Sequence, residues 1–200
     1  MTRVYGTSQS GNCHKVRMAL EALRLPYQWT EIDSTRGETR TAQFLAMNPN
    51  GKVPVLEIEP GNYLPESNAI LCYLADGTPL LPGDRLARAR VLQWLFFEQY
   101  SHEPYIAVAR FLRKFHPDPA SQRALAESKL PGGYRALEVM DRHLERNSFF
   151  VGDRYSIADI ALYGYTHVAD EGGFDLGRFP AVRAWLSRVQ GQPGYVGMRA

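Results

Sequence analysis

The sequence predicts an α/β domain followed by an all-helical domain. Strand and helix patterns alternate through the first third of the 200 residues, and the later periodic segments have helical spacing. Between these regions lies a short stretch rich in glycine and proline, which is typical of a linker. We therefore expect an α/β domain at residues 1–76, a linker at 77–85 and an all-α domain at 86–200. The residues that mark the linker are Gly77, Pro79, Pro82 and Gly83.

The first strand and helix are predicted within the first 26 residues. Val4 and Tyr5 form a short strand-like run near the N-terminus. Pro26 cannot continue a helix, so we expect the first helix to end just before it. The apolar residues on one face of that helix are Val16, Ala19, Leu20 and Leu23.

Five further elements complete the α/β domain. The next strand alternates apolar and polar residues, a Gly-Asn turn joins two hairpin strands, and turn residues bound the two helices. The resulting order β-α-β-α-β-β-α is expected of a thioredoxin-like domain. The elements are a strand at 27–32, a weaker helix at 39–46, hairpin strands at 53–58 and 63–64, and a helix at 66–75.

The helical domain is predicted to begin with a long helix near Leu86. Leu92, Leu95 and Phe96 are expected to lie together on one face of this helix. Pro104 lacks a backbone N–H, so we expect it to kink or end the helix.

Two later motifs define helix positions in the same domain. Pro131-Gly132-Gly133 predicts a kink or a restart in a helix that otherwise continues toward Arg146. Ser156 and Asp159 form a Ser-x-x-Asp capping box, which marks a helix start. A last helix is expected after Pro180.

Composition excludes several classes of function. The 23 basic and 21 acidic residues leave a formal net charge of +2, and no block of like charge indicates nucleic acid or a membrane surface as a partner. The chain shows no run that resembles a signal peptide or a membrane span. Cys13 and Cys72 form no disulfide framework, which favours a reducing cytoplasmic setting. The histidines show no metal-ligand spacing, so we expect no metal site.

Two short motifs predict a peptide-binding site in the α/β domain. A cis bond between Val53 and Pro54 would explain a proline at a strand start, and would present the Val53 N–H and C=O to an extended peptide. Glu66 and Ser67 stand at a predicted helix start, where Glu66 can hold an ammonium group and Ser67 with unpaired N–H groups a carboxylate. Glutathione is a small peptide with both charges at one end. An ordinary strand edge and an ordinary helix cap are the alternative interpretation.

In a thioredoxin-like fold, the sulfur that reacts lies beside the loop between the first strand and the first helix. A thiol with a pKa of about 8.5 is only about 3% ionised at pH 7, and lowering the pKa by about two units ionises roughly three quarters of it. Ser10 stands at the predicted helix start and can donate a hydrogen bond to the thiolate there. Ser8 and Tyr5 are competing donors, and Ser10 can also be a simple helix cap. Cys13 is a less favoured candidate for the nucleophile.

These motifs, in this order, resemble the glutathione transferase family over essentially the whole chain. The resemblance implies a thioredoxin-like domain, an all-helical C-terminal domain and a homodimer that uses glutathione as co-substrate. Ser10 matches the serine-type position of bacterial theta-like members, which stabilises the glutathione thiolate. Asn12 in Ser10-Gly11-Asn12-Cys13-His14-Lys15 resembles the nu-like members, which reduce disulfides with glutathione, although they carry Thr where this chain has Ser10. Lys52 is a candidate contact for the glycine carboxylate of glutathione.

The second substrate is expected against the first helix of the helical domain. Glu98, His102 and Tyr105 recur at helical spacing, and we assign His102 and Tyr105 to the second-substrate pocket. A packed interior face is the alternative. Three functions follow from the resemblance: conjugation of glutathione to a small hydrophobic electrophile, reduction of a disulfide or hydroperoxide, or glutathione binding without catalysis.

Overall fold

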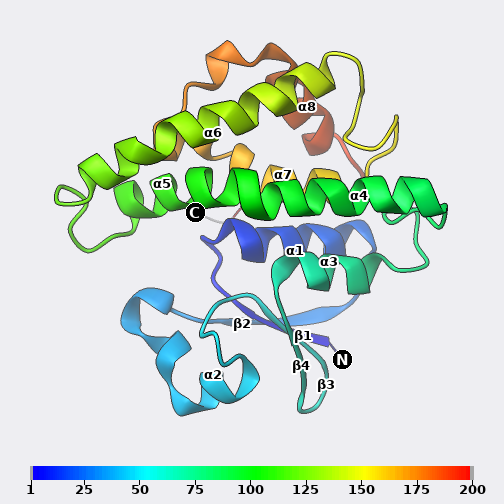
Figure 1. Cartoon of the computed structure of the whole chain (residues 1–200). Coiled ribbons are helices and arrows are strands. Elements are labelled where there is room, and N and C mark those ends of the chain that lie inside the picture. The colour runs from blue at the N-terminus through cyan, green and yellow to red at the C-terminus, as the bar shows by residue number, and fades with distance from the viewer. Residues whose placement is uncertain (1, 199–200) are drawn as a thin grey trace. The chain divides into compact units, whose positions relative to one another are not determined.

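The computed structural model describes residues 2–198 and divides them into two compact units (Figure 1). The first unit contains the described residues up to Thr78 together with those from Pro193 onward, and the second is Pro79–Gln192. The first is an α/β unit and the second is helical, so the predicted fold class is confirmed.

A four-stranded mixed sheet forms the centre of the α/β unit. The strand order is β2-β1-β3-β4, with β1 parallel to β2 and antiparallel to β3. Strand β3 continues through a hairpin into β4, as the Gly-Asn turn predicts. The strands are β1 (Thr2–Gly6), β2 (Tyr27–Glu31), β3 (Val55–Glu59) and β4 (Asn62–Pro65).

Helices cover both faces of this sheet. Figure 1 shows α1 (Gly11–Ala22) and α3 (Ser67–Ala75) over one face and the short α2 (Ala42–Met47) over the other. Because side chains alternate across a strand, β1 turns Val4 toward α1 and α3 and Tyr5 toward the opposite side. The buried core of the first face consists of Val4, Val16, Leu20, Leu56 and Ile70. Two 3₁₀ turns, Ser34–Arg36 and Glu38–Arg40, precede α2.

The C-terminal tail packs with the α/β unit, whereas the sequence places it in the helical domain. His14 Nε2 lies 2.8 Å from the Val196 carbonyl oxygen, and the Arg17 guanidinium donates to the Gly197 carbonyl oxygen. His14 and Arg17 lie one turn apart on α1, and both are almost fully buried. These contacts give the tail main-chain partners on α1, which explains why the boundary predicted from helix patterns is wrong here.

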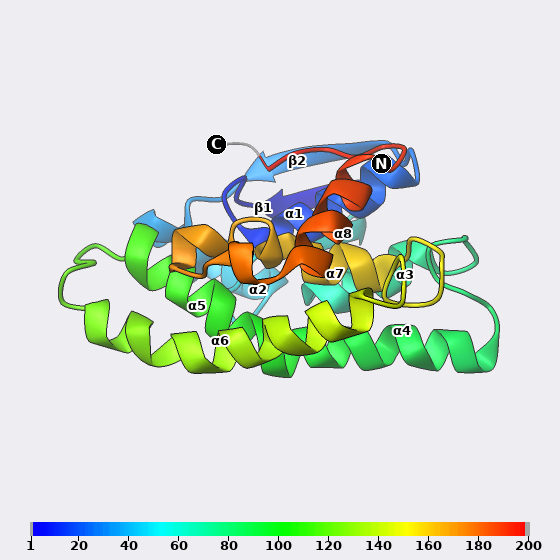
Figure 2. The ribbon, with the colours of Figure 1, turned by 90° about the horizontal axis from the view of Figure 1, so that it is seen from above.

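The second unit consists of five α-helices, one π-helical turn and two 3₁₀ turns among its described residues. Viewed from above, α6 runs beside α5 in the lower layer of Figure 2. The helices are α4 (Arg85–Phe97), α5 (Glu103–Lys114), α6 (Arg123–Leu144), α7 (Ile157–Thr166) and α8 (Pro180–Gln190). The π-helical turn η3 is Glu98–His102, and the 3₁₀ turns are η4 (Ala169–Gly172) and η5 (Leu176–Arg178).

The π-helical turn η3 lies immediately before Pro104, where the sequence predicts a kink or an end. Proline cannot donate the next hydrogen bond of an α-helix, so the regular α-helical pattern is interrupted here by a single π-helical turn, and α5 begins with Glu103 and Pro104. The sequence predicts Leu92, Leu95 and Phe96 on the buried face of α4. In the structure Val91, Trp94 and Leu95 are buried and Phe96 is 70% exposed, so the buried face is shifted by one residue from the predicted one.

Pro131-Gly132-Gly133 does not restart a helix. Helix α6 continues through all three residues. A Cβ atom at Gly132 would lie only 2.2 Å from the ring of Tyr105, and one at Gly133 only 2.3 Å from the ring of Phe174. The two glycines therefore allow aromatic rings to lie directly against the α6 backbone.

The capping box predicted at Ser156 and Asp159 is confirmed at the start of α7. Within residues 2–198, no helix has both the length and the apolar character needed to cross a membrane.

Candidate functional site

Ser10 caps the N-terminus of α1, directly after the loop that follows β1. Its backbone is extended, with φ −86° and ψ 128°, and its carbonyl oxygen accepts the His14 N–H at 2.9 Å. The Ser10 hydroxyl oxygen accepts the Cys13 N–H at 3.3 Å. A hydroxyl oxygen that accepts one N–H still carries its own proton, so Ser10 can both cap the helix and donate to an anion.

Asn12 and Ser67 bring the two predicted motifs together. The Ser67 hydroxyl donates to Asn12 Oδ1 at 3.2 Å, although the residues are 55 positions apart. Asn12 is in the first turn of α1, and Ser67 is the first residue of α3. Two helix N-termini therefore meet at this contact. Each carries N–H groups that the helix does not satisfy, so the region attracts anions such as a carboxylate or a thiolate.

Glu66 occupies a strained backbone position beside this contact. It is the N-cap of α3, with φ +71° and ψ 108°, and its side chain is exposed. A positive φ is unfavourable for a residue with a Cβ atom and costs on the order of 1–3 kcal/mol. Such strain is concentrated at functional sites. The exposed carboxylate next to Ser67 is consistent with a role in holding a cation.

Val53 and Pro54 lie just before β3, and the bond between them is cis, as the sequence predicts. Val53 is half-buried and Lys52 is exposed. Among the described residues, no hydrogen bond to the Val53 main chain is found. This leaves its N–H and C=O available to an extended peptide, which is the geometry that strand addition requires.

The loop that carries Lys52 is held by a residue that the sequence analysis missed. Asn48 is almost fully buried, and its Nδ2 donates to the Lys52 carbonyl oxygen at 2.7 Å. Its Oδ1 accepts the Asn50 N–H at 3.1 Å. The second hydrogen bond closes an Asx-turn, in which an asparagine side chain accepts the backbone N–H two residues later. The sequence Asn-Pro-Asn-Gly favours such a turn. That local signature could have identified Asn48 from sequence.

Arg40 is a second residue whose position the sequence did not define. Its Nη1 donates to the Asn50 carbonyl oxygen at 3.4 Å. A Cβ atom at Gly51, where φ is +62°, would lie 2.5 Å from the same nitrogen. Arg40 and Lys52 therefore supply two positive charges to one loop. No spacing in the sequence links residue 40 to residue 52, so no pattern could have shown this.

Cys13 is not suited to be the nucleophile. The side chain is fully buried, and burial raises the pKa of the thiol to about 12, although neighbouring Ser10 and the hydrogen bond from the Thr7 N–H lower it. The thiolate is the reactive form, so such a thiol is inert at neutral pH. The side chain instead fills the space beside Gly6, where a Cβ atom would lie 3.0 Å from Cys13 Sγ.

Ser8 and Tyr5, the two competing hydroxyl donors, both have partners elsewhere. The Ser8 hydroxyl donates to Glu31 Oε1 at 3.2 Å and the Ser8 N–H to the same oxygen at 2.7 Å. Burial raises the pKa of Glu31, but the hydrogen bonds it accepts from Ser8 and Trp29 lower it by more. The Tyr5 hydroxyl donates to Glu57 Oε2 at 2.9 Å. Ser10 remains the best placed of the three.

His102 and Tyr105 have interior contacts within the helical unit. His102 is fully buried, and its Nε2 lies 2.8 Å from Thr166 Oγ1, which donates to the Leu162 carbonyl oxygen at 2.6 Å. The Tyr105 ring lies against Gly132. These contacts match the alternative interpretation, in which this helix face is packed inside the unit, so the second-substrate pocket stays a prediction.

The part of the chain that the structure describes has no group of three or more His, Cys, Asp or Glu residues that could hold a metal ion.

Comparison with known proteins gives this arrangement a family. The N-terminal domain model of glutathione S-transferases matches residues 9–76, and their C-terminal domain model matches residues 96–193. The chain is 31% identical to the disulfide-bond oxidoreductase YfcG of Escherichia coli K12 over 192 residues, which cover 91% of this chain and 87% of YfcG.

Solved structures agree with this result. A glutathione S-transferase from Pseudomonas fluorescens Pf-5 is 55% identical with a TM-score of 0.96, and the match covers 100% of this chain and 99% of the other. A glutathione transferase family member from the same organism, solved with two glutathione bound, is 30% identical with a TM-score of 0.84, covering 96% of this chain and 89% of the other. The chain belongs to the glutathione S-transferase family.

Proposed function

We propose that this chain is an enzyme of the serine type that activates the thiol of glutathione. The observation that carries the proposal is the hydrogen bond between Ser67 and Asn12. It joins the helix start that carries Ser10 to the helix start that carries Glu66, so a tripeptide held by one end at Glu66 can reach Ser10 with its thiol. A relative solved with bound glutathione supports the choice of ligand.

Each end of glutathione has a matching group in the α/β unit. Glu66 pairs with the ammonium of the γ-glutamyl end, and the N–H groups in the first turn of α3 hold its carboxylate. The Val53 main chain pairs with the peptide backbone beside Pro54. Lys52 and Arg40, whose guanidinium donates to Asn50 on the Lys52 loop, face the carboxylate of the glycine end.

Ser10 stabilises the thiolate form of the bound thiol. A pKa lowered by about two units requires about 2.7 kcal/mol of differential stabilisation. A charge-assisted hydrogen bond from the Ser10 hydroxyl supplies about 1.5–3 kcal/mol, and the N-terminus of α1 adds up to about 1 kcal/mol. These contributions are sufficient without a general base. The thiolate then attacks an electrophilic carbon of a small hydrophobic substrate, so that a C–S bond forms and the leaving group departs as an anion with the electron pair of the bond that breaks.

The proposal is tested by titrating the protein with reduced glutathione and following thiolate absorbance in the ultraviolet against pH. We expect saturable binding and a bound thiol pKa about two units below that of free glutathione. Binding with an unchanged thiol pKa would indicate a binding protein without catalysis. If glutathione does not bind at all, the proposed function is wrong.

Disulfide reduction is a second candidate activity, favoured by the similarity to YfcG. The thiolate of one glutathione attacks the disulfide, forms a mixed disulfide and releases one thiolate; a second glutathione then attacks the mixed disulfide and yields oxidised glutathione and the second thiol. Because Cys13 is buried with a raised pKa, the two sulfurs that are oxidised both belong to glutathione.

This second candidate predicts that Cys13→Ala reduces a small disulfide at a rate within about threefold of wild type. The measurement is the glutathione-dependent turnover of a small symmetrical disulfide, coupled to the reduction of oxidised glutathione. Conjugation to a carbon electrophile is assayed on the same preparations. A Cys13→Ala variant that folds but reduces no disulfide would show that the protein thiol takes part.

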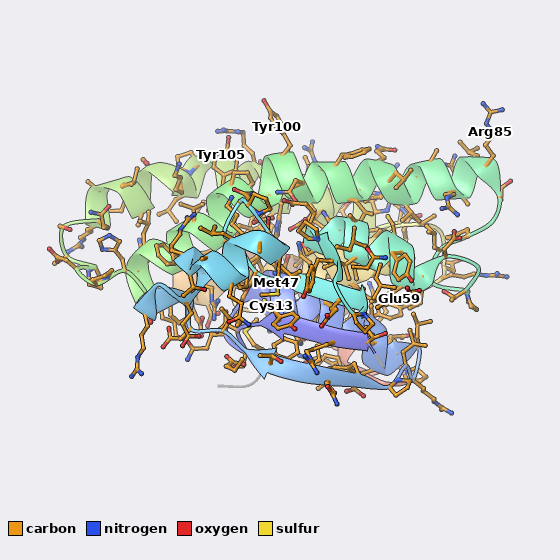
Figure 3. All side chains as sticks on the ribbon, turned by 90° about the horizontal axis from the view of Figure 1, so that it is seen from below. Cys13, Met47, Glu59, Arg85, Tyr100 and Tyr105 are labelled. Atoms are coloured by element: carbon orange, nitrogen blue, oxygen red, sulfur yellow. The ribbon has the colours of Figure 1, made fainter. Side chains whose placement is uncertain are left out.

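We also propose a homodimer in the cytoplasm. Phe96 and Tyr100 are 70% and 83% exposed, one turn apart along α4 and the π-helical turn η3, and Figure 3 shows Tyr100 projecting away from the helix. Two large exposed aromatic side chains on one helix face favour an interface. A mass in solution of about twice 22.6 kDa by sedimentation supports the dimer, and a monomer mass excludes it.

The proposed compartment, the cytoplasm, is supported by the cysteines. Cys13 and Cys72 form no disulfide, which suits a reducing compartment.

A further inference from the structure

Glu31, the last residue of β2, lies beside the loop that leads into α1. Strands β1 and β2 are parallel, and their last residues, Gly6 and Glu31, are paired in register. The loop that leads to Ser10 leaves β1 directly after Gly6. The Glu31 side chain is therefore close enough to bond to this loop, although it belongs to another strand.

The Glu31 carboxylate accepts hydrogen bonds both from the loop and from its own strand. Oε1 accepts the Ser8 N–H at 2.7 Å and the Ser8 hydroxyl at 3.2 Å. Oε2 accepts the Trp29 indole N–H at 2.7 Å. Trp29 is half-buried, and its ring lies directly against Gly6, where a Cβ atom would be 3.1 Å from it. Trp29 thus fixes the orientation of the carboxylate that holds Ser8.

The same peptide bond that Glu31 holds also holds Ser10. The Ser10 N–H donates to the Thr7 carbonyl oxygen at 3.1 Å, which closes a turn over residues 7–10. The Thr7 carbonyl and the Ser8 N–H belong to one planar peptide unit, so fixing one end of this unit fixes the other. A rigid connection therefore runs from the Glu31 carboxylate through one peptide plane to the main chain of Ser10.

We propose that Glu31 is a positioning residue for Ser10: its carboxylate holds the peptide between Thr7 and Ser8, and this peptide holds the Ser10 main chain. The inference rests on the proposed function, in which the Ser10 hydroxyl donates to the thiolate of glutathione. A donor that is already held in place loses less conformational entropy when it binds an anion than a donor that must first be ordered. Glu31 thereby contributes to thiol activation without touching glutathione.

The negative charge of Glu31 has the opposite effect on a thiolate from the positioning. Burial is the main cause of the raised pKa of the Cys13 thiol, and the charge of Glu31 adds to it. A thiolate bound beside Ser10 is subject to the same repulsion. Removing Glu31 therefore has two effects of opposite sign: loss of the charge lowers the pKa of the bound thiol, and loss of the positioning raises it.

The first test uses the ligand-free protein. The exchange of the Ser8 and Ser10 amide protons with water is measured by NMR in wild type, Glu31→Ala and Glu57→Ala. Glu57 is the matched control, because its carboxylate also holds a turn N–H, that of Gly61 at 3.1 Å, but in the β3–β4 hairpin. We expect both amides to exchange at least about fivefold faster in Glu31→Ala and within about twofold of wild type in Glu57→Ala. Faster exchange at Ser8 alone, or at neither residue, would overturn the proposal.

The second test measures the bound thiol in wild type, Glu31→Ala and Glu31→Gln. Glutathione affinity is measured by calorimetry and the thiol pKa by thiolate absorbance. In Glu31→Ala we expect a rise of about 0.5 unit, about threefold in the ionisation constant, with an affinity within about threefold of wild type. Glutamine has no charge but keeps an acceptor oxygen for the Ser8 N–H, so Glu31→Gln should leave the thiol pKa at or below the wild-type value. A lowered thiol pKa in Glu31→Ala, or equal effects of the two variants, would overturn the proposal.

The two tests distinguish failure of this inference from failure of the proposed function. If the wild type binds no glutathione, the proposed function is wrong, while the amide exchange rates still decide whether Glu31 holds Ser10. If glutathione binds with a lowered thiol pKa that Glu31→Ala leaves unchanged, the proposed function stands and the inference is wrong. Glu31 is exposed, so Glu31→Ala is expected to fold. Ser8→Ala keeps the main-chain N–H that Glu31 accepts and should behave as wild type.

Discussion

Replacing Ser10 by alanine is expected to return the thiol pKa of bound glutathione to nearly that of a free thiol, while glutathione still binds. On the proposed role, the hydroxyl of Ser10 is the main donor to the thiolate, and a charge-assisted hydrogen bond contributes about 1.5–3 kcal/mol. Its loss corresponds to a rise of about 1–2 pKa units. The affinity for glutathione should fall only a few-fold, because the proposed function assigns the other parts of the peptide to Glu66, the first turn of α3 and the Val53 main chain.

The same substitution has a rate effect whose pH dependence is diagnostic. At pH 7 a thiol with a pKa of about 6.5 is about 76% ionised and one with a pKa of about 8.5 about 3%, so turnover should fall about 25-fold from ionisation alone. The deficit should shrink as the pH rises through the thiol pKa of the variant, because both enzymes then hold mostly thiolate. The measurement is the rate of glutathione conjugation or disulfide reduction between pH 6 and pH 9.

Ser8→Ala is the matched control for Ser10→Ala. Ser8 lies two residues earlier in the same loop, and its hydroxyl already donates to Glu31, so its removal should leave the thiol pKa unchanged. Ser10→Ala also removes the cap of α1 and should lower the free energy of unfolding by about 1 kcal/mol. A fall in activity in Ser10→Ala that does not depend on pH would point to a damaged helix start. An equal effect of Ser8→Ala on the thiol pKa would exclude Ser10 as the specific donor.

The features that the sequence predicts well are those that neighbouring residues determine. The cap at Ser10 and the box at Ser156 and Asp159 are hydrogen bonds within one helical turn, so residue type and spacing are enough to predict them. The strands and the first helix follow from apolar periodicity. The order of these elements then restricts the fold to very few topologies.

The features that the sequence does not predict depend on tertiary contacts. No local pattern places the Ser67 hydroxyl against Asn12, or Arg40 beside the Lys52 loop. Apolar spacing predicts Phe96 on the buried face of α4, but Phe96 is exposed, because the apolar residues alone do not determine which face of a helix is covered. Pro131-Gly132-Gly133 predicts a break when only propensity is considered, but Tyr105 and Phe174 lie where Cβ atoms would otherwise be.

Asp159→Ala is expected to cause the largest loss of stability of any substitution considered for this chain. Oδ1 of Asp159 accepts the Trp185 indole N–H at 2.9 Å and the Phe150 N–H at 3.1 Å. Oδ2 accepts the Ser156 N–H at 3.0 Å and the Ser156 hydroxyl at 3.1 Å. Asp159 and Trp185 are fully buried, so alanine leaves buried donors without partners, each at a cost of about 1–3 kcal/mol. We expect a loss of about 4 kcal/mol in the free energy of unfolding, measured by urea denaturation.

Asp84→Ala is the control that separates this network from an ordinary helix cap. Asp84 caps α4 with one hydrogen bond, from the Ala87 N–H at 2.8 Å, and its side chain is exposed. Loss of this cap should lower the free energy of unfolding by only about 1 kcal/mol. If Asp159→Ala is too unstable to purify, Ser156→Ala removes one of the four donors and should cost about 1–2 kcal/mol. Equal effects of Asp159→Ala and Asp84→Ala would contradict the argument.

The pH dependence of the Asp159→Ala effect tests the buried charge itself. Burial raises the pKa of Asp159 from its ordinary value of 3.8 to about 6, although the donors from Trp185, Phe150 and Ser156 oppose the shift. A carboxyl group whose pKa is raised on folding binds a proton more tightly in the folded state. Its contribution to stability is therefore complete below about pH 4 and is lost as the pH rises through about 6. The difference in unfolding free energy between wild type and Asp159→Ala should thus be larger at pH 4.5 than at pH 7.5. A difference that grows with pH would show instead that the four donors outweigh burial and stabilise the carboxylate.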